Sequence, residues 1–291
     1  MLNAAGRAGP EFARLGFTLP SFTRMVWVSE AARLAWAPQV EKIQQAWQQA
    51  EWRSVCAGLR PCAFLQYYSD RYAEAYGEWR RHGLKVEPLQ MARKADGRYF
   101  VNAAVGAKHA ARWFKKAWIR RDHDEMGKLL GYPECCRAYF RTWFEERRLN
   151  DPTWLIAQNR GWVAVQGAIV TAYGDPLTNI LHRYCGVRAV PHLPCGFECA
   201  ASHDFAERLL ALYPELGYAE QAQRLREMLD WPMEWTALHG ILELRTPLLK
   251  LAANTDASAE KLTVRWLGRT IPAGAARGLG FPYDAIQGAE S

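Results

Sequence analysis

Two short cysteine motifs constrain the fold of this chain more than any other feature, because one shared site needs both of them. The first is GYPECC at residues 131–136, and the second is HLPCGFECAAS at residues 192–202. A helix-like pattern follows each motif, and a helix N-terminus offers free amide N–H groups and a positive dipole end that stabilise thiolates. Soft thiolate ligands gathered in this way are typical of a metal or iron–sulfur site. The predicted ligands are Cys135, Cys136, Cys195 and Cys199.

The adjacency of Cys135 and Cys136 bears on the identity of the metal. Two neighbouring cysteines reach one tetrahedral zinc ion only with strain, whereas a cubane cluster is larger and its corners lie farther apart. We therefore expect a [4Fe-4S] cluster as the cofactor, with zinc (Zn) as the alternative. If only three thiolates bind, one iron stays open to a substrate or a sulfide. The residues that would fill or guard this corner, and hence the candidate catalytic residues, are His192, Glu134 and Glu198.

The second motif departs from a known iron–sulfur pattern at one position. Its C-x3-C-x2-S spacing is similar to the C-x3-C-x2-C loop of radical-SAM enzymes, but Ser202 stands where the third cysteine would be. This argues against a standard radical-SAM enzyme. The chain also lacks a P-loop, a G-x-S-x-G elbow and an H-E-x-x-H zinc motif. The leading hypothesis is therefore an iron–sulfur enzyme of the sulfur transferase or lyase type. Its expected partners are a small-molecule or anionic substrate and a protein that donates electrons or sulfur.

Other interpretations of the cysteines stay open. Free cysteine is among the most buried residue types, so the four predicted ligands also fit an ordinary core. Metal-free thiol redox chemistry ranks last, because the chain has no C-x-x-C and a disulfide between adjacent cysteines is strained. Cys56 and Cys62 form a C-x5-C pair that we expect to pack at a helix end. Cys185 lies in a predicted turn and receives no role.

The paired motifs resemble those of an uncharacterised family of bacterial and archaeal proteins. Its members carry Gly-Tyr-Pro-x-Cys-Cys and His-x-Pro-Cys-x3-Cys-x2-Ser. The segment DPLTNILHRY at residues 175–184 is also part of the resemblance. The resemblance covers about residues 100–205. It implies a shared site but no particular reaction. The residues to which it extends are Gly131, Tyr132, Pro133, Cys135, Cys136, His192, Pro194, Cys195, Cys199 and Ser202.

Outside the motifs, the composition is that of a soluble protein. Apolar residues make up 49% of the chain and charged residues 23%. No run approaches the roughly 20 apolar residues that cross a bilayer, and the first residues lack the apolar stretch and cleavage site of a secretory signal. We therefore expect a cytoplasmic protein without membrane contact. Reducing cytosol disfavours disulfides, and seven cysteines cannot all pair, which favours ligand roles for the clustered cysteines.

The net charge of +7 supports a second function class. A predicted helix carries most of its basic residues on one side, and the chain contains 13 tryptophans, which fill cores or stack on bases. The alternative hypothesis is therefore a zinc-stabilised nucleic-acid-binding module, although a solvated helix face explains the same charges. The basic residues are Arg112, Lys115, Lys116, Arg120 and Arg121.

Periodicity predicts a helix-rich α/β or α+β fold with a small central sheet and a C-terminal β-hairpin element. Strands expected at 62–68, 85–91 and 99–105 surround a helix at 71–81 in a βαβ-like arrangement. Further helices are expected at 38–58, 108–130 and 135–148, from residue 202 or 204 to 212, and at 220–229. We divide the chain into a poorly structured leader (1–37), a cysteine-motif α/β domain (38–230) and a C-terminal β-containing accessory region (231–291).

Overall fold

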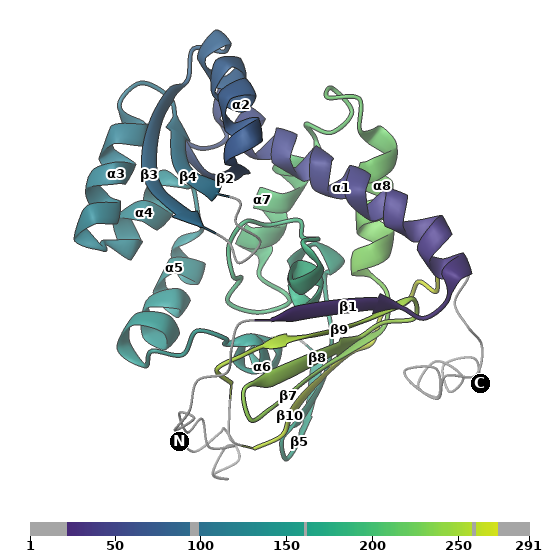
Figure 1. Ribbon diagram of the computed structural model, residues 1–291. Helices are drawn as coiled ribbons and strands as arrows, with labels where there is room; N and C mark the ends of the chain where they lie inside the picture. The colour runs from purple at the N-terminus through teal and green to yellow at the C-terminus, as the bar shows by residue number, and fades with distance from the viewer. Residues whose placement is uncertain (1–21, 94–98, 160–161, 258–259, 273–291) are drawn as a thin grey trace.

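The fold combines a large mixed sheet, a small antiparallel sheet and helices that pack on both (Figure 1). It is seen in a computed structural model that describes residues 22–93, 99–159, 162–257 and 260–272. The mixture of helices and strands, the small sheet and the C-terminal strand region confirm the predicted fold class. No helix in these ranges has the length and apolar character needed to cross a membrane.

The large sheet has the strand order β1-β9-β8-β7-β10-β6-β5. All neighbours are antiparallel except β10 and β6, which are parallel. The runs expected to form a C-terminal hairpin were 234–250 and 261–270; the first splits into β7, β8 and the start of β9, and the second contains β10, which pairs with β7. Strand β10 also extends the sheet to β6, which precedes residue 230. The strands are β1 (Thr23–Trp27), β5 (Trp162–Gln166), β6 (Ile169–Tyr173), β7 (Met233–Leu238), β8 (Ile241–Arg245), β9 (Leu249–Asn254) and β10 (Leu262–Trp266).

One face of the large sheet lies against the main hydrophobic core. Buried and exposed residues alternate along β7 and β8, as they do in a sheet with one solvated face. The buried face packs against α1 (Glu30–Cys56), α7 (Ala200–Leu210) and α8 (Ala219–Leu229). Trp36 of α1 meets Trp231 edge to face at 4.6 Å, which joins the long helix to the segment between α8 and β7. Most of the tryptophans of the described chain therefore serve the core.

The small sheet has the order β2-β4-β3 and is covered by helices on both faces. Its strands are β2 (Cys62–Tyr68), β3 (Lys85–Arg93) and β4 (Tyr99–Gly106). The helix α2 (Ser69–Arg81) connects β2 to β3, and β4 lies between them, which is a split βαβ unit. The end of α1 packs with α2 on one face, around Trp52 and Trp79. The helices α3 (Ala110–Arg120) and α4 (His123–Leu129) pack on the other face, around Phe114.

The first helix begins earlier than its sequence predicts. It was expected to start at Pro38, but α1 starts at Glu30, because the side chain of Ser29 accepts a hydrogen bond from the backbone N–H of Ala32. Pro38 lies inside the helix. Strand β1 pairs with β9, so residues 23–27 and 30–37 of the predicted leader belong to regular elements. Residues 1–21 lie outside the described part of the chain.

Two other predicted helices are broken into shorter pieces. The expected helix at 108–130 ends at Arg121, whose φ of 56° is left-handed, and Asp122 then caps α4 by accepting from the backbone N–H of Glu125. The expected helix at 135–148 consists of α5 (Glu134–Phe140) and the π-helical turn η1 (Arg141–Glu146). The remaining short helices are α6 (Thr153–Gln158), η2 (Pro176–Thr178) and η3 (Leu181–Cys185).

Candidate metal centre

The GYPECC motif forms a tight turn that ends in the first turn of α5. Gly131 has a φ of 72°, and a Cβ atom built on it would lie 2.9 Å from Cβ of Arg60. This position therefore needs glycine both for its conformation and for its close contact. Pro133 precedes α5, and its carbonyl accepts from the backbone N–H of Cys136 at 3.1 Å. The turn places Cys135 and Cys136 at the amino end of α5.

The second motif is a loop that is held in the core before it enters α7. Phe197 is fully buried and meets Trp266 edge to face at 5.1 Å. Its carbonyl accepts from the backbone N–H of Asp175 at 3.2 Å and from the hydroxyl of Thr178 at 2.5 Å. Asp175, which caps η2, and Thr178 of η2 therefore hold the loop in place through the carbonyl of Phe197. Cys199 lies at the N-cap of α7, four residues after Cys195.

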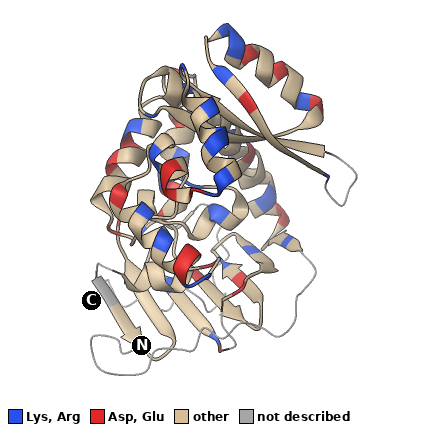
Figure 2. Ribbon diagram, turned by 90° about the vertical axis from the view of Figure 1, so that its left-hand side faces the viewer, with Lys and Arg blue, Asp and Glu red and all other residues tan. Residues whose placement is uncertain are grey.

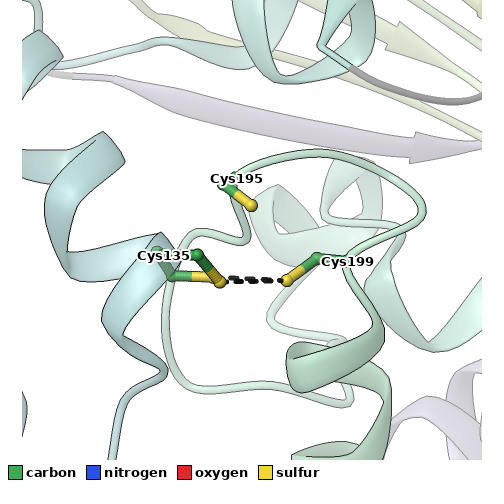
Figure 3. Close-up of side chains that lie close together, drawn as sticks. Cys135, Cys195 and Cys199 are labelled. Atoms are coloured by element: carbon green, nitrogen blue, oxygen red, sulfur yellow. Dashed lines mark hydrogen bonds between the residues drawn. The ribbon is translucent and has the colours of Figure 1, made fainter.

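The four predicted ligands converge on one point. Their sulfur atoms all lie within 4.8 Å of one another. The Sγ–Sγ distances are 3.9 Å between Cys135 and Cys136, 3.7 Å between Cys135 and Cys199, and 3.6 Å between Cys136 and Cys199. In Figure 3 the side chains of Cys195 and Cys199 point from the loop and the start of α7 toward the cysteines of α5. Four close cysteines of this kind can bind a metal.

Burial differs among the four cysteines. Cys136, Cys195 and Cys199 are buried in a small cluster against which Tyr139 packs, and Cys135 is exposed. Solvent therefore reaches the centre at Cys135, whereas the other three cysteines are shielded from it. Burial of three of the four thiols lowers the local dielectric, which strengthens the attraction between thiolates and a cation.

The cluster distributes protons unequally among its thiols. Hydrogen bonds from Cys136 and Cys195 hold the pKa of Cys199 well below that of an ordinary thiol, and burial only partly opposes them. Hydrogen bonds with Cys195 and Cys199, together with burial, raise the pKa of Cys136. Within this group, Cys199 is therefore the thiol that loses its proton most readily, and Cys136 keeps its proton. If all four thiols lost their protons, the thiolates would repel one another at these distances, and a bound cation would offset that repulsion.

His192 reaches the cluster through Ser202 rather than directly. The Oγ atom of Ser202 lies 3.2 Å from Sγ of Cys136 and 2.8 Å from Nε2 of His192. The imidazole lies between the rings of Tyr132 and Phe205, with centroid distances of 5.0 Å and 5.7 Å. Burial lowers the pKa of His192 to about 3, so the ring is neutral. The structure thus places the predicted His192 in contact with Ser202, which orients it.

The two glutamates predicted to guard an open metal corner are both exposed. Glu134 precedes Cys135 at the start of α5, and Glu198 precedes Cys199 in the loop. In the described ranges, the group of mutually close ligand atoms around the cluster consists of four sulfurs, without a carboxylate or an imidazole. Glu134 and Glu198 therefore flank the centre without belonging to its ligand set.

The other three cysteines lie apart from this ligand set. Cys62 and Cys185 are buried in two different hydrophobic clusters, and Cys56 is exposed at the end of α1. Burial raises the pKa of both Cys62 and Cys185 to about 12, which makes their thiols poor nucleophiles. Cys62 therefore packs in the core, but it does so from strand β2 and not at a helix end, and the exposed Cys56 at the end of α1 does not pack as expected.

A polar pair next to the centre was missed by sequence reasoning. His203 follows Ser202 on α7, and its Nδ1 atom hydrogen bonds to Oδ2 of Asp175. Asp175 also caps η2 by accepting from the backbone N–H of Leu177 at 3.0 Å. Asp175 stands at the start of DPLTNILHRY, where sequence alone indicates only a turn. Its contact with His203 depends on the long-range placement of α7, so the pattern carried no signal for it.

Comparisons with protein-family models, with curated proteins and with solved structures give no match to this chain.

Proposed function

We propose that this protein is a zinc–thiolate protein in which Cys135, Cys136, Cys195 and Cys199 bind one tetrahedral ion. The sulfur spacing carries the proposal. A Zn–S bond of about 2.3 Å in a regular tetrahedron separates neighbouring sulfurs by about 3.8 Å. The Sγ–Sγ distances among Cys135, Cys136 and Cys199 are 3.6, 3.7 and 3.9 Å, which match the edge length of that tetrahedron, and Sγ of Cys195 lies within 4.8 Å of all three.

The contact between the two adjacent cysteines favours zinc over the cluster expected from the sequence. That expectation rested on the strain of binding one ion through neighbouring residues. The helical start of α5 brings Sγ of Cys135 within 3.9 Å of Sγ of Cys136, and both lie near Cys199. Two neighbouring thiols can therefore share one small ion here.

The arrangement of the ligands supports a structural role for the ion. Four protein thiolates complete a tetrahedron and leave no position for substrate, as in structural zinc sites. The four cysteines come from two segments that are distant in sequence, α5 and the loop that leads into α7. Ligands in a low-dielectric site bind zinc with a free energy that adds to folding. The centre would thus fasten α5 to α7.

A [4Fe-4S] cluster is the second candidate, and the exposure of Cys135 favours it. When bound, a cluster with one iron free of cysteine would supply a Lewis acid or an electron for sulfur transfer or related small-molecule chemistry. Cys135 opens the centre to solvent, and Glu134 and Glu198 flank that opening. A cubane needs its thiolates farther apart than one ion does, so Cys135 and Cys136 would have to move outward.

Metal analysis of protein prepared without oxygen separates the two candidates. We expect one zinc per chain, no visible absorption and no acid-labile sulfide. Changing each of the four ligand cysteines to Ala should remove the zinc. The controls Cys185→Ala, at a buried cysteine outside the site, and Cys56→Ala, at an exposed one, should keep it. Stoichiometric iron and sulfide with visible absorption would overturn zinc in favour of the cluster, and metal-free protein after reconstitution with either would overturn both.

A further inference from the structure

The positive charge of this protein is concentrated in one short segment. Residues 108–121 contain six lysines and arginines and no aspartate or glutamate, whereas the whole chain has a net charge of +7. The segment comprises α3 and the residues that flank it. Elsewhere acidic residues nearly balance the basic ones.

The helix presents these charges on the side that faces away from the small sheet. Ala111, Phe114 and Ala117 are buried against the sheet and form the inward face of α3. Figure 2 views the molecule from the side on which α3, α4 and α5 lie, and basic residues recur along the helices there. The exposed residues, which we call the α3 surface, are Lys108, His109, Arg112, Trp113, Lys116, Ile119, Arg120 and Arg121.

The α3 surface combines regularly spaced charges with an exposed indole. Arg112, Lys116 and Arg120 follow one another at intervals of four residues, or about 6 Å along the helix axis. Trp113 is 54% exposed beside this row, and its ring lies 6.1 Å from that of His109. A large aromatic side chain turned to solvent is unusual in a chain that buries most of its tryptophans.

The charges of this surface are mostly uncompensated. Lys115 pairs with Glu87 at 3.2 Å, but it lies at the margin of the surface. Arg120 lies 3.9 Å from a carboxylate oxygen of Asp122, at the limit of an ion pair, and both side chains are exposed. Among the described residues, Arg112 and Lys116 make no ion pair. These two charges are free to bind an anion.

We propose that the α3 surface binds single-stranded nucleic acid. A row of basic side chains matches a chain of phosphates, and an exposed indole offers a stacking platform for an unpaired base. A duplex keeps its bases stacked inside, so it would use the charges but not Trp113. The proposal does not depend on the identity of the metal, because α3 packs on the small sheet and not on the cysteines.

Fluorescence anisotropy with labelled oligonucleotides tests the proposal. The probes are a 12-mer of oligouridine, the matching oligothymidine and a 12-base-pair DNA duplex, each titrated with full-length protein over a range of salt concentrations. We expect both single strands to bind at low salt more tightly than the duplex, and the affinity to fall steeply as salt rises. The tighter binder of the two single strands, oligouridine or oligothymidine, shows whether the surface prefers RNA or DNA. Equal or tighter binding of the duplex, or no binding at low salt, overturns the proposal.

Two variants and one control locate the binding surface. The double variant Arg112→Glu, Lys116→Glu should weaken binding at least tenfold and reduce the slope of log K against log salt by about 1.4, the value for two phosphate contacts on a single strand. Trp113→Ala should weaken binding about 5- to 150-fold without changing that slope, as for one lost base stack. The control Lys42→Glu, Lys250→Glu makes the same charge change at exposed sites elsewhere.

The outcome of these variants decides between a specific surface and diffuse attraction. An equal loss of affinity in the control pair, or an unchanged affinity in Trp113→Ala, overturns the proposed surface. The metal content of each variant should equal that of the parent protein. A failure of the zinc proposal would appear only in that metal content, and a failure of this proposal only in the anisotropy.

Discussion

The hydroxyl of Ser202 lies 3.2 Å from the sulfur of Cys136. It occupies the position at which a third cysteine would follow a C-x3-C pair, but in this fold the other two cysteines of the group, Cys135 and Cys136, come from α5. Ser202 therefore contributes a hydrogen bond to a ligand rather than a ligand. The nitrogen Nε2 of His192 lies 2.8 Å from the same hydroxyl and holds it in place. This chain of three groups links α7, the loop before it and α5.

Removing the hydroxyl of Ser202 should weaken metal binding. In Ser202→Ala, Cys136 loses a hydrogen-bond partner and Nε2 of the buried His192 loses its partner too. Loss of such an outer contact weakens metal affinity by about 10- to 100-fold. Titration with a competing chromophoric chelator measures the change. The control Thr246→Val removes another buried hydroxyl, between β8 and β9, and should leave zinc affinity unchanged. Equal affinities for Ser202→Ala and the parent would contradict this role.

Chelation should destabilise the parent protein and spare a variant that cannot bind metal. A ligand that binds only the folded state stabilises it by about 4 kcal/mol when its free concentration is a thousand times Kd. EDTA should therefore lower the Tm of the parent to the Tm that Cys199→Ala shows without EDTA. Differential scanning fluorimetry measures both, and the Tm of Cys199→Ala should not respond to EDTA. A parent Tm that is insensitive to EDTA, in protein shown to have lost its metal, would rule out a structural role for the ion.

The sequence predicted that the four cysteines share one site but not how they meet. Adjacent thiols in Cys135 and Cys136, and the C-x3-C pair that follows 60 residues later, were enough to predict one site. Their distances depend on the turn at Gly131 and on the anchoring of Phe197 in the core, which are tertiary features. The expectation of a cubane rested on the strain of binding one ion through neighbouring cysteines, and in α5 their two sulfurs lie 3.9 Å apart, so the choice between zinc and a cluster stays a prediction.

The small sheet was predictable where the large one was not. The strands β2, β3 and β4 form from neighbouring segments, so alternation and turn residues locate them. Strand β1 was missed because its partner β9 lies more than 220 residues away, and an isolated strand of five residues has little pattern of its own. The break between α3 and α4 was missed because Arg121 adopts a left-handed φ that its residue type does not favour.

The buried carboxylate of Asp151, near the end of β9, should make the free energy of unfolding depend on pH in the acidic range. Asp151 is buried and accepts hydrogen bonds from Thr153, from Tyr184 at 2.7 Å, from Thr255 at 2.7 Å and from Arg183 at 3.1 Å. Burial alone would raise its pKa, but Arg183 and the three hydroxyls hold it below the ordinary carboxyl value. The folded-state pKa is thus lower than the unfolded one. The stability from Asp151 is present above the unfolded pKa and is lost as pH falls through the folded pKa.

The variant Asp151→Asn tests this dependence. Removing one partner of a buried ion pair leaves Arg183 uncompensated, so stability near neutral pH should fall by about 3–5 kcal/mol. The difference between the parent and the variant should shrink as the pH drops below about 4. Urea unfolding across the pH range measures both effects. The control Asp204→Asn changes an exposed carboxylate and should alter stability little at any pH. A difference that is constant with pH would refute the role of the charge.

Gly131 should be essential for both stability and metal loading, and Gly58 offers a matched control. The two glycines have nearly the same backbone φ, 72° and 71°, but a Cβ atom at Gly58 meets nothing within 4 Å, whereas one at Gly131 lies 2.9 Å from Cβ of Arg60. Gly58→Ala should therefore cost only about 1 kcal/mol of conformational strain. Gly131→Ala adds a clash with a buried arginine and shifts the start of α5, so it should cost more and lower the zinc content. Urea unfolding and metal analysis of the two variants give the comparison, and equal losses in both would show that the contact with Arg60 does not position the cysteines of α5.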